Sequence, residues 1–238
     1  MMTSNHDIRG AIVDTAIELA ESSSWEAVRL FDVAVKMKIS LDDIRLHFRE
    51  KEELVDAWFD RADSAMLKIS ENEGFLALSH QERLNDLILV WLKALSVHRN
   101  VTRQMIGAKL EPGHVHIQIP AIMRVSRTVQ WVREAAQRDA TYVRRALEET
   151  ALTTIYLATF VYWMNDASND SQNTREFLRH KLQFAETLDR AIYGSQQESA
   201  GSPQELSLPD WGRMWMWFPR VNPSGWPIRS PCAATATA

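Results

Sequence analysis

The sequence is poor in the residues that build several classes of functional site. Its 238 residues include a single cysteine, Cys232, which excludes an internal disulfide and a cysteine-based metal cage. No apolar run approaches the roughly 18 residues of a membrane-spanning helix, and no signal peptide precedes the first helical pattern. Nucleophile elbows, phosphate-binding loops and dinucleotide fingerprints are also missing. We therefore expect a soluble, cytoplasmic, non-enzymatic protein without catalytic residues, cofactor or metal.

Positive charge is scarce in the amino-terminal part of the chain. Residues 1–68 hold nine Lys and Arg against fourteen Asp and Glu, a net −5, whereas the whole chain carries −4. Neutralisation of phosphates supplies most of the non-specific affinity for DNA, so a DNA-binding domain usually has the opposite sign.

Alternating strand patterns are absent as well, and apolar residues recur with a helical period from end to end. Ser40 with Asp43, and Ser79 with Glu82, form capping boxes that predict the starts of two helices. Another helix is expected to begin at Lys51. The prediction is an all-α protein with three parts: a three-helix helix-turn-helix domain, a larger helical bundle for ligand binding and dimerisation, and a tail rich in Pro and Trp. Their expected bounds are 1–50, 51–194 and 195–238.

The carboxy-terminal half contains the longest helical patterns. His114–Pro120 is expected to be a loop, and Tyr142–Met164 a long helix. Within that helix, Ala151–Met164 has no charged residue, which predicts burial nearly all round. Thr174–Tyr193 is the last predicted helix, with Gly194 as a natural stop.

The tail that follows has a different composition. Residues 195–238 contain four of the nine tryptophans, and neither a helical nor a strand period is evident there. Indole rings with a few arginines are typical of a membrane interface. A flap over the core and an extension without function are the alternatives.

The amino-terminal segment carries a set of residues at a characteristic spacing: Ala34, Ile39, Ser40, Ile44, His47, Phe48, Lys51, Glu52, Glu53 and Leu54. Over residues 9–60 this frame resembles the helix-turn-helix domain of the TetR family of transcriptional regulators. Lys38 replaces the turn glycine of that family, Asp42 and Asp43 replace the small residues that open the recognition helix, and Arg45 replaces the aromatic that contacts phosphate. These departures indicate a domain that keeps the fold of a regulator but serves another function.

A second resemblance covers the other half of the chain. It rests on Trp131, the run Tyr142–Ala146, Ile155, Tyr156, Thr159, Met164, Asp166, Ser168, Asp170, Thr174, Phe177 and Leu178. These residues look like the carboxy-terminal half of the mitochondrial coenzyme Q accessory lipid-binding proteins and their bacterial relatives, the COQ9-like family. That family is itself built on a TetR-like fold.

The second resemblance implies a non-enzymatic accessory protein of ubiquinone biosynthesis that holds an isoprenoid or other lipid in a hydrophobic pocket. Seven residues are candidates for contact with the lipid: Trp131, Leu152, Ile155, Tyr156, Thr159, Tyr162 and Trp163. Packing of the core or of a dimer seam is the alternative role for each. The implied partners are an isoprenoid quinone precursor or a phospholipid, a quinone-pathway hydroxylase, the membrane surface and a second copy of the chain. We expect a bacterial cytoplasmic protein, peripheral on the inner membrane.

A ligand-responsive transcriptional regulator is the alternative function. DNA is the partner only in that case, and it would be contacted by Arg29, Lys36, Ser40, Arg45, His47 and Lys51.

Overall fold

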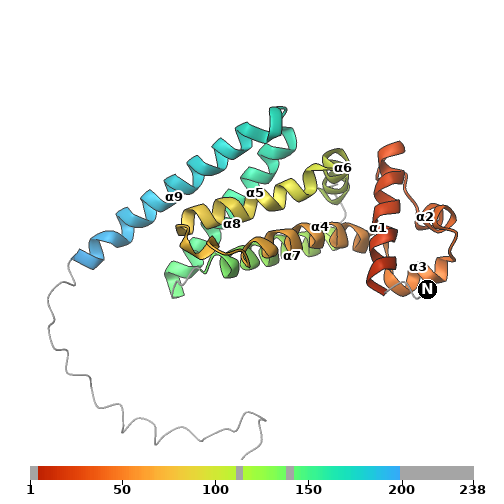
Figure 1. Ribbon diagram of the computed structural model, residues 1–238, viewed down its shortest axis with the longest axis horizontal. Coiled ribbons are helices and arrows are strands. Elements are labelled where there is room, and N and C mark those ends of the chain that lie inside the picture. Colours follow the sequence, from red (N-terminus) through yellow and green to blue (C-terminus); the bar gives the residue numbers. More distant parts are fainter. Residues whose placement is uncertain (1–4, 111–114, 138–141, 199–238) are drawn as a thin grey trace, which may run out of the picture. The chain divides into compact units, whose positions relative to one another are not determined.

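The computed structural model describes residues 5–110, 115–137 and 142–198 (Figure 1). These residues form nine α-helices and no strand: α1 Asn5–Ser22, α2 Leu30–Met37, α3 Leu41–His47, α4 Lys51–Ile69, α5 His80–Ser96, α6 Arg99–Leu110, α7 Val115–Ala135, α8 Tyr142–Asn165 and α9 Gln172–Glu198. Short 3-10 turns lie at Phe75–Ala77 and Asn169–Ser171. The chain divides into the units 1–192 and 193–238, and the packing below is that of the first. The predicted all-α fold is confirmed for the described residues.

Helices α1 to α3 form the predicted helix-turn-helix. Lys38 ends α2 in the left-handed conformation, with φ 57°, at the position where glycine is usual because it has no Cβ to strain. The capping box of α3 is confirmed. The Ser40 amide donates to the Asp43 carboxylate at 2.9 Å, and the Asp43 amide donates to the Ser40 hydroxyl at 3.0 Å.

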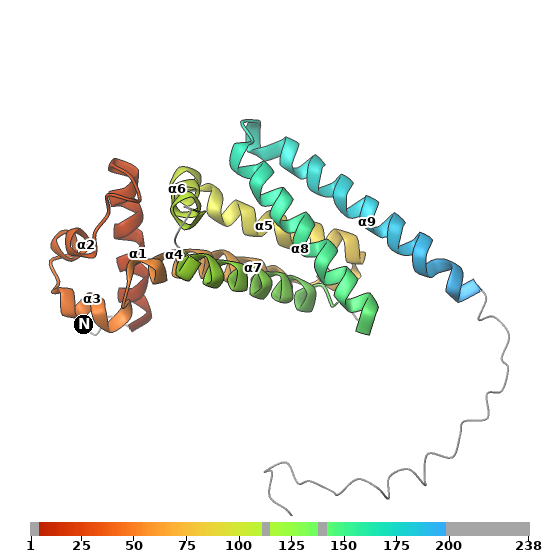
Figure 2. The ribbon, with the colours of Figure 1, turned by 180° about the vertical axis from the view of Figure 1, so that it is seen from behind.

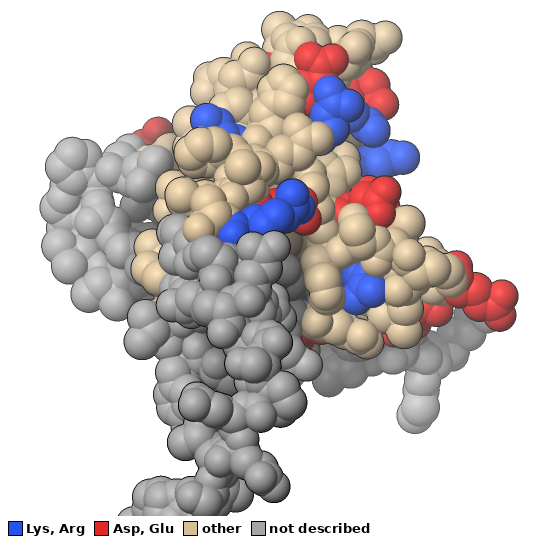
Figure 3. All heavy atoms as spheres, turned by 90° about the vertical axis from the view of Figure 1, so that its left-hand side faces the viewer, with Lys and Arg blue, Asp and Glu red and all other residues tan. Residues whose placement is uncertain are grey.

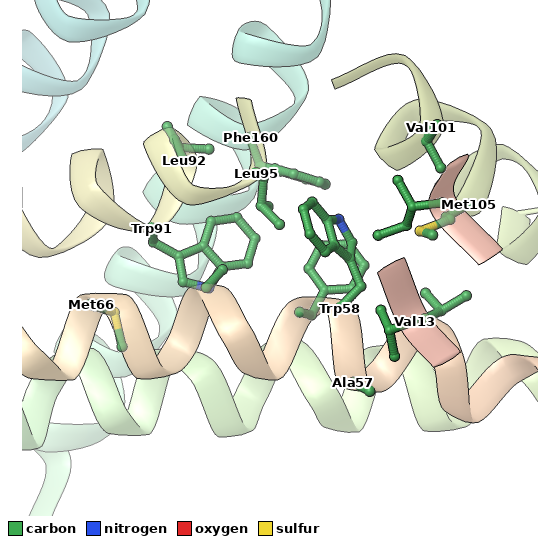
Figure 4. Packing of buried hydrophobic residues seen from close by; sticks show 14 of the residues in the cluster. Val13, Ala57, Trp58, Met66, Trp91, Leu92, Leu95, Val101, Met105 and Phe160 are labelled. Carbon is green, nitrogen blue, oxygen red and sulfur yellow. The ribbon is translucent and has the colours of Figure 1, made fainter. Parts of the chain in front are cut away.

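The larger helical bundle is built on α4, which packs most extensively on α5 and also contacts α1 and α7 (Figure 2). Helix α8 packs on α7 and α5. Side chains from several helices meet in the core, where Trp58 of α4, Trp91 of α5 and Phe160 of α8 are all buried (Figure 4). The Trp58 indole donates to the Thr102 hydroxyl at 3.0 Å, so its polar edge is satisfied inside the core.

Polar contacts also fix the helix-turn-helix to the rest of the first unit. Arg61 of α4 donates to the Asp14 carboxylate at 2.5 Å and to the Gly10 carbonyl at 2.8 Å, both on α1. The Trp25 amide, in the turn after α1, donates to the Gln104 side chain of α6 at 2.6 Å. Two helices of the bundle therefore hold α1 and the turn that follows it.

The prediction that Ala151–Met164 is buried nearly all round is wrong. One face of this stretch is buried, through Leu152, Tyr156, Thr159, Phe160 and Trp163, but Leu157, Val161 and Tyr162 are exposed on the other. The outer face carries no charged residue, because alanines and threonines lie between these apolar side chains. The Thr154 hydroxyl, for example, donates to the Thr150 carbonyl at 2.8 Å, so it needs no partner from another helix.

Two predicted boundaries also differ from the structure. The expected loop His114–Pro120 is helical from Val115 onward, and Pro120 is the sixth residue of α7, so a proline did not mark the helix boundary here even though it removes one backbone hydrogen bond. His114 itself lies outside the described residues. Gly194 does not end α9, which continues to Glu198; glycine inside a helix costs only about 1 kcal/mol relative to alanine.

Candidate functional site

The cations predicted to contact DNA are largely neutralised by this chain's own carboxylates. Three of them form ion pairs: Arg29 with Asp32 at 2.8 Å, Lys36 with Glu18 at 2.9 Å, and Arg45 with Asp42 at 2.8 Å. Such exposed pairs contribute only about 0–1 kcal/mol to stability, so a phosphate is able to compete for the cation. The carboxylate would remain beside the phosphate, however, and would cancel most of the attraction.

Of the three remaining predicted DNA contacts, Lys51 and Ser40 have structural roles, whereas His47 is engaged only through its backbone. The Lys51 ammonium donates to the Trp25 carbonyl at 2.5 Å and to the Glu26 carbonyl at 3.1 Å, and burial lowers the pKa of Lys51. Ser40 caps α3, as described above. His47 accepts a hydrogen bond from Arg9 through its backbone carbonyl, at 2.6 Å. The face that would meet DNA thus offers few groups that are available for phosphates.

Large apolar side chains are exposed on the same two helices. They are Phe31 and Val35 on α2 and Leu41 and Leu46 on α3, with Leu46 exposed by 70%. Such side chains provide no charge for phosphates, the contacts that position a protein on DNA, although base edges are read by apolar as well as polar groups.

The seven residues predicted to bind lipid fall into two groups. Leu152, Tyr156, Thr159 and Trp163 are buried, and Ile155 is partly buried against the core. Trp131 of α7 and Tyr162 of α8 are exposed by 47% and 40%. The structure therefore does not bring all seven to one surface, and their contact with lipid stays a prediction.

Aromatic rings fill the interior beside the buried group. Trp91 meets the Tyr156 and Phe160 rings edge-on, with centroid distances of 5.1 and 5.5 Å. Phe160 stacks on Trp163 at 5.8 Å, and the Thr159 hydroxyl donates to the Ile155 carbonyl of its own helix at 2.7 Å. Tyr156 and Trp163 do project to the same side of α8, as their spacing predicts, but they face packed side chains.

A polar network crosses this interior, and the sequence reading missed it. The Asp63 carboxylate of α4 accepts from the Trp91 indole at 2.7 Å and from the Thr128 hydroxyl at 3.2 Å, and pairs with Arg124 of α7 at 3.3 Å. Burial raises the pKa of Asp63, although the Trp91 hydrogen bond and the Arg124 charge oppose this. Burial also raises the pKa of the Tyr156 phenol, and the nearby Asp63 charge adds to that shift. The network links four helices.

An open groove of about 820 Å³ runs along the outer side of α8. We call it the outer groove; it is lined by Thr154, Leu157, Ala158, Val161, Tyr162, Asn165, Asp166, Ala167 and Asn173. Only Tyr162 among these was predicted as a lipid contact. The run of uncharged residues in α8 was the available signal, but it does not tell an exposed apolar face from a buried one. Figure 3 views the molecule from the left of Figure 1, and the described surface there is mainly uncharged.

The turn between α8 and α9 forms one end of the outer groove. The Asp166 carboxylate accepts from the Thr174 hydroxyl at 2.6 Å, the Thr174 amide at 2.9 Å and the Ser168 amide at 2.9 Å. Burial acts to raise the pKa of Asp166, but these hydrogen bonds outweigh it and the pKa lies below the usual range. Asp170 and Ser171 have positive φ angles of 49° and 53°. This capped turn fixes how α9 leaves α8.

Within the described ranges, no cluster of His, Cys, Asp and Glu side chains has an arrangement suited to a metal ion. No helix in the same ranges is both long and apolar enough to span a membrane.

Comparisons with known proteins agree with both resemblances. The sequence model of the COQ9 family matches residues 128–189, which include α8 and most of α9. A solved structure described as a TetR transcriptional regulator from Nitrosomonas europaea is 62% identical, with a TM-score of 0.68 over 76% of this chain and 98% of that chain. A TetR transcriptional regulator from a Rhodococcus species shares the fold, with 18% identity, a TM-score of 0.58, and coverage of 76% of this chain and 97% of its own.

No curated protein matches the chain significantly. The 62% identity with the Nitrosomonas europaea protein extends over 76% of this chain and 98% of that one. The chain therefore belongs to the family of that protein, has a TetR-like fold, and contains a segment, residues 128–189, that matches the COQ9 family.

Proposed function

We propose that this chain is a non-enzymatic, lipid-binding accessory protein of ubiquinone biosynthesis. The match of residues 128–189 to the COQ9 family carries the proposal, because these residues include α8, with its uncharged outer face and groove. An isoprenoid quinone precursor is the lipid that such a role requires, and the protein presents it to a hydroxylase of the pathway at the membrane surface.

The ion pairs within the helix-turn-helix support this proposal over DNA binding. A protein that makes 6 to 10 phosphate contacts releases as many counterions. Here Arg29, Lys36 and Arg45 have carboxylate partners, and Lys51 is held by backbone carbonyls. Too few of the predicted cations are left for that number of contacts.

Exposed apolar residues support contacts with a membrane or a second copy. Phe184 and Leu188 lie one turn apart on α9 and are exposed by 67% and 49%. A stripe of this kind, on a helix that also carries Lys and Arg, suits peripheral docking on a bilayer. It also suits one side of a homodimer, which we propose as the assembled form.

The test is mass spectrometry of lipids that copurify with the protein from its own cells. We expect a stoichiometric isoprenoid or other long-chain lipid, released by denaturation. A protein purified under mild conditions without any lipid, and unable to take up an added prenyl lipid, contradicts the proposal.

A ligand-responsive transcriptional regulator is the second candidate. One observation favours it: the relative that is 62% identical is described as a TetR transcriptional regulator. The test is binding to duplex DNA from the surrounding genomic region at physiological salt. A complex with Kd around 10⁻⁸ M, as specific readers achieve, supports this candidate, whereas only salt-sensitive, non-specific binding leaves the accessory role standing.

A further inference from the structure

We propose that the adjacent residues His98 and Arg99 link the helix-turn-helix to the turn between α8 and α9, so that each of these two regions stabilises the other. Helix α5 ends at Ser96 and α6 begins at Arg99. Both ribbon views show α6 between the helix-turn-helix and the α8–α9 turn (Figures 1 and 2). The link gives the helix-turn-helix a role that needs neither DNA nor a lipid, and it is independent of the proposed function.

The first half of the link is the contact between His98 and the end of α1. The Nδ1 atom of His98 lies 2.5 Å from the carboxylate of Glu21, in the last turn of α1. The His98 ring also meets the Trp58 ring of α4 edge-on, with centroids 5.6 Å apart. Trp58 is buried and donates to the Thr102 hydroxyl. The imidazole is therefore held between a carboxylate and an indole that is itself fixed.

The second half is the contact between Arg99 and the α8–α9 turn. Its guanidinium donates to the Asp166 carbonyl at the start of the turn and to the Ser171 hydroxyl at its end, both at 2.5 Å. The same group lies over the Trp163 ring, 4.7 Å from the centroid, and Trp163 is fully buried. A guanidinium is planar and its donors have a fixed geometry. Two hydrogen bonds and one ring contact therefore set the position of the turn relative to α6.

The start of α6 joins the two contacts. The His98 carbonyl accepts from the Thr102 amide at 2.9 Å and from the Thr102 hydroxyl at 3.0 Å. These bonds close the first turn of α6, which carries Arg99. Adjacent side chains on a helix point about 100° apart, so one reaches α1 and the next reaches the α8–α9 turn. Helix ends fray readily, and release of His98 from Glu21 therefore loosens the helical turn that holds Arg99.

Helix α6 contacts the helix-turn-helix a second time, further along its length. The Gln104 side chain accepts from the Trp25 amide at 2.6 Å. The Trp25 carbonyl in turn accepts from the Lys51 ammonium at 2.5 Å. A shift of α6 that followed the α8–α9 turn would have to break these bonds as well. Coupling between distant sites is carried by such chains of hydrogen-bonded and packed groups.

The link works in both directions, because coupling free energies between two sites are reciprocal. A partner that orders the α8–α9 turn also stabilises the helix-turn-helix, and loosening of the helix-turn-helix weakens the turn. The turn lies within residues 128–189, the segment that matches the COQ9 family. The helix-turn-helix is thus a structural support for this segment, which explains how it serves the protein without its cations being available for phosphates.

The test is hydrogen exchange of the full chain, followed by NMR at the Ser168 and Thr174 amides, which donate to Asp166 in the turn. Glu21→Ala removes the partner of His98 from an exposed position. We expect exchange at the two amides to rise about fivefold or more. Glu21→Gln keeps an oxygen that accepts from the imidazole and should behave like the unaltered chain.

Two other positions on α1 supply matched controls. Glu18→Ala breaks an ion pair with Lys36 inside the helix-turn-helix, and Asp14→Ala breaks an ion pair with Arg61 of α4. Neither contact passes through α6, so exchange at the turn should stay within about twofold.

The reverse direction is read at the other end of the link. Ser171→Ala removes one acceptor of Arg99. It should raise exchange of the Trp25 amide, which donates to Gln104, by about fivefold or more.

Four results would overturn the link. The first is unchanged exchange at the turn in Glu21→Ala. The second is an equal rise in Glu21→Ala, Glu18→Ala and Asp14→Ala, since the effect would then be a general loosening of α1. A third is an equal rise in Glu21→Gln and Glu21→Ala, because the hydrogen bond to His98 would then carry nothing. The fourth is a Trp25 amide that does not respond to Ser171→Ala, because coupling has to be reciprocal. Absence of a bound lipid, by contrast, would contradict the proposed function and leave this link standing.

Discussion

The buried network around Asp63 makes a prediction whose magnitude follows from its contacts. Asp63→Leu removes the acceptor of the Trp91 indole at 2.7 Å and of the Thr128 hydroxyl at 3.2 Å. Each buried donor left without a partner costs about 1–3 kcal/mol. Arg124 keeps Asp60 at 2.9 Å, so no unpaired buried charge is added. We expect Asp63→Leu to lower the free energy of unfolding by about 2–6 kcal/mol.

Asp63→Asn is the matched variant, because it removes the charge and keeps an oxygen that accepts from Trp91. We expect its stability to lie within about 1 kcal/mol of the unaltered chain. The assay is urea denaturation followed by tryptophan fluorescence. Equal stability of the leucine and asparagine variants would refute the reasoning, since hydrogen bonds to Asp63 would then contribute nothing.

The same pair of variants predicts a pH dependence. Burial raises the pKa of Asp63 above 3.8 in the folded chain, so between the unfolded and the folded pKa the folded state binds more protons. Stability from this group therefore falls as pH rises through that window and is level above it. Asp63→Asn should remove this slope from a series of urea titrations, and an unchanged slope would refute the assignment.

Three further predictions concern DNA, the turn and the membrane. Asp42→Ser removes the partner of Arg45, which is 2.8 Å away, and should raise non-specific DNA affinity in a gel shift at low salt; unchanged affinity would contradict the neutralising role. Asp166→Ala removes the acceptor for Thr174 and should lower stability by about 1–2 kcal/mol. Because the pKa of Asp166 is lowered on folding, this contribution is present at neutral pH and is lost as pH falls below the unfolded value; a loss of stability that is independent of pH would count against it. Liposome flotation of the full chain and of a version ending at Glu198 divides membrane binding between α9 and the tail: equal flotation assigns it to α9, and no flotation of either removes the membrane from the account.

Local signals in the sequence were sufficient to predict the helix-turn-helix and most of the positions at which helices begin. The capping boxes of Ser40 and Ser79 are both present, because each depends only on residues three positions apart. The departure at Lys38 also lies where a left-handed residue is needed. The expected boundaries at Pro120 and Gly194 were wrong, because a proline or glycine disfavours a helix at its own position without fixing where the helix begins or ends.

The candidate site was harder to predict from the sequence. A charge-free helix such as Ala151–Met164 gives no information on which face meets the core, so Val161 and Ala158 of the outer groove were overlooked. The Asp63 network needs Arg124 and Trp91, which lie far from Asp63 in the sequence and come together only in the folded bundle. Spacing on one helix predicts a shared face, but it does not predict what that face meets.

Ubiquinone content of cells is the measurement that tests the central claim most directly. The gene is deleted and then replaced by the unaltered chain or by a variant in which Arg29, Lys36 and Arg45, three of the predicted DNA contacts, are alanine. An accessory lipid-binding role predicts that quinone content falls on deletion and is restored both by the unaltered chain and by the triple alanine variant. Unchanged quinone content on deletion, or restoration that requires these three residues, would contradict the account.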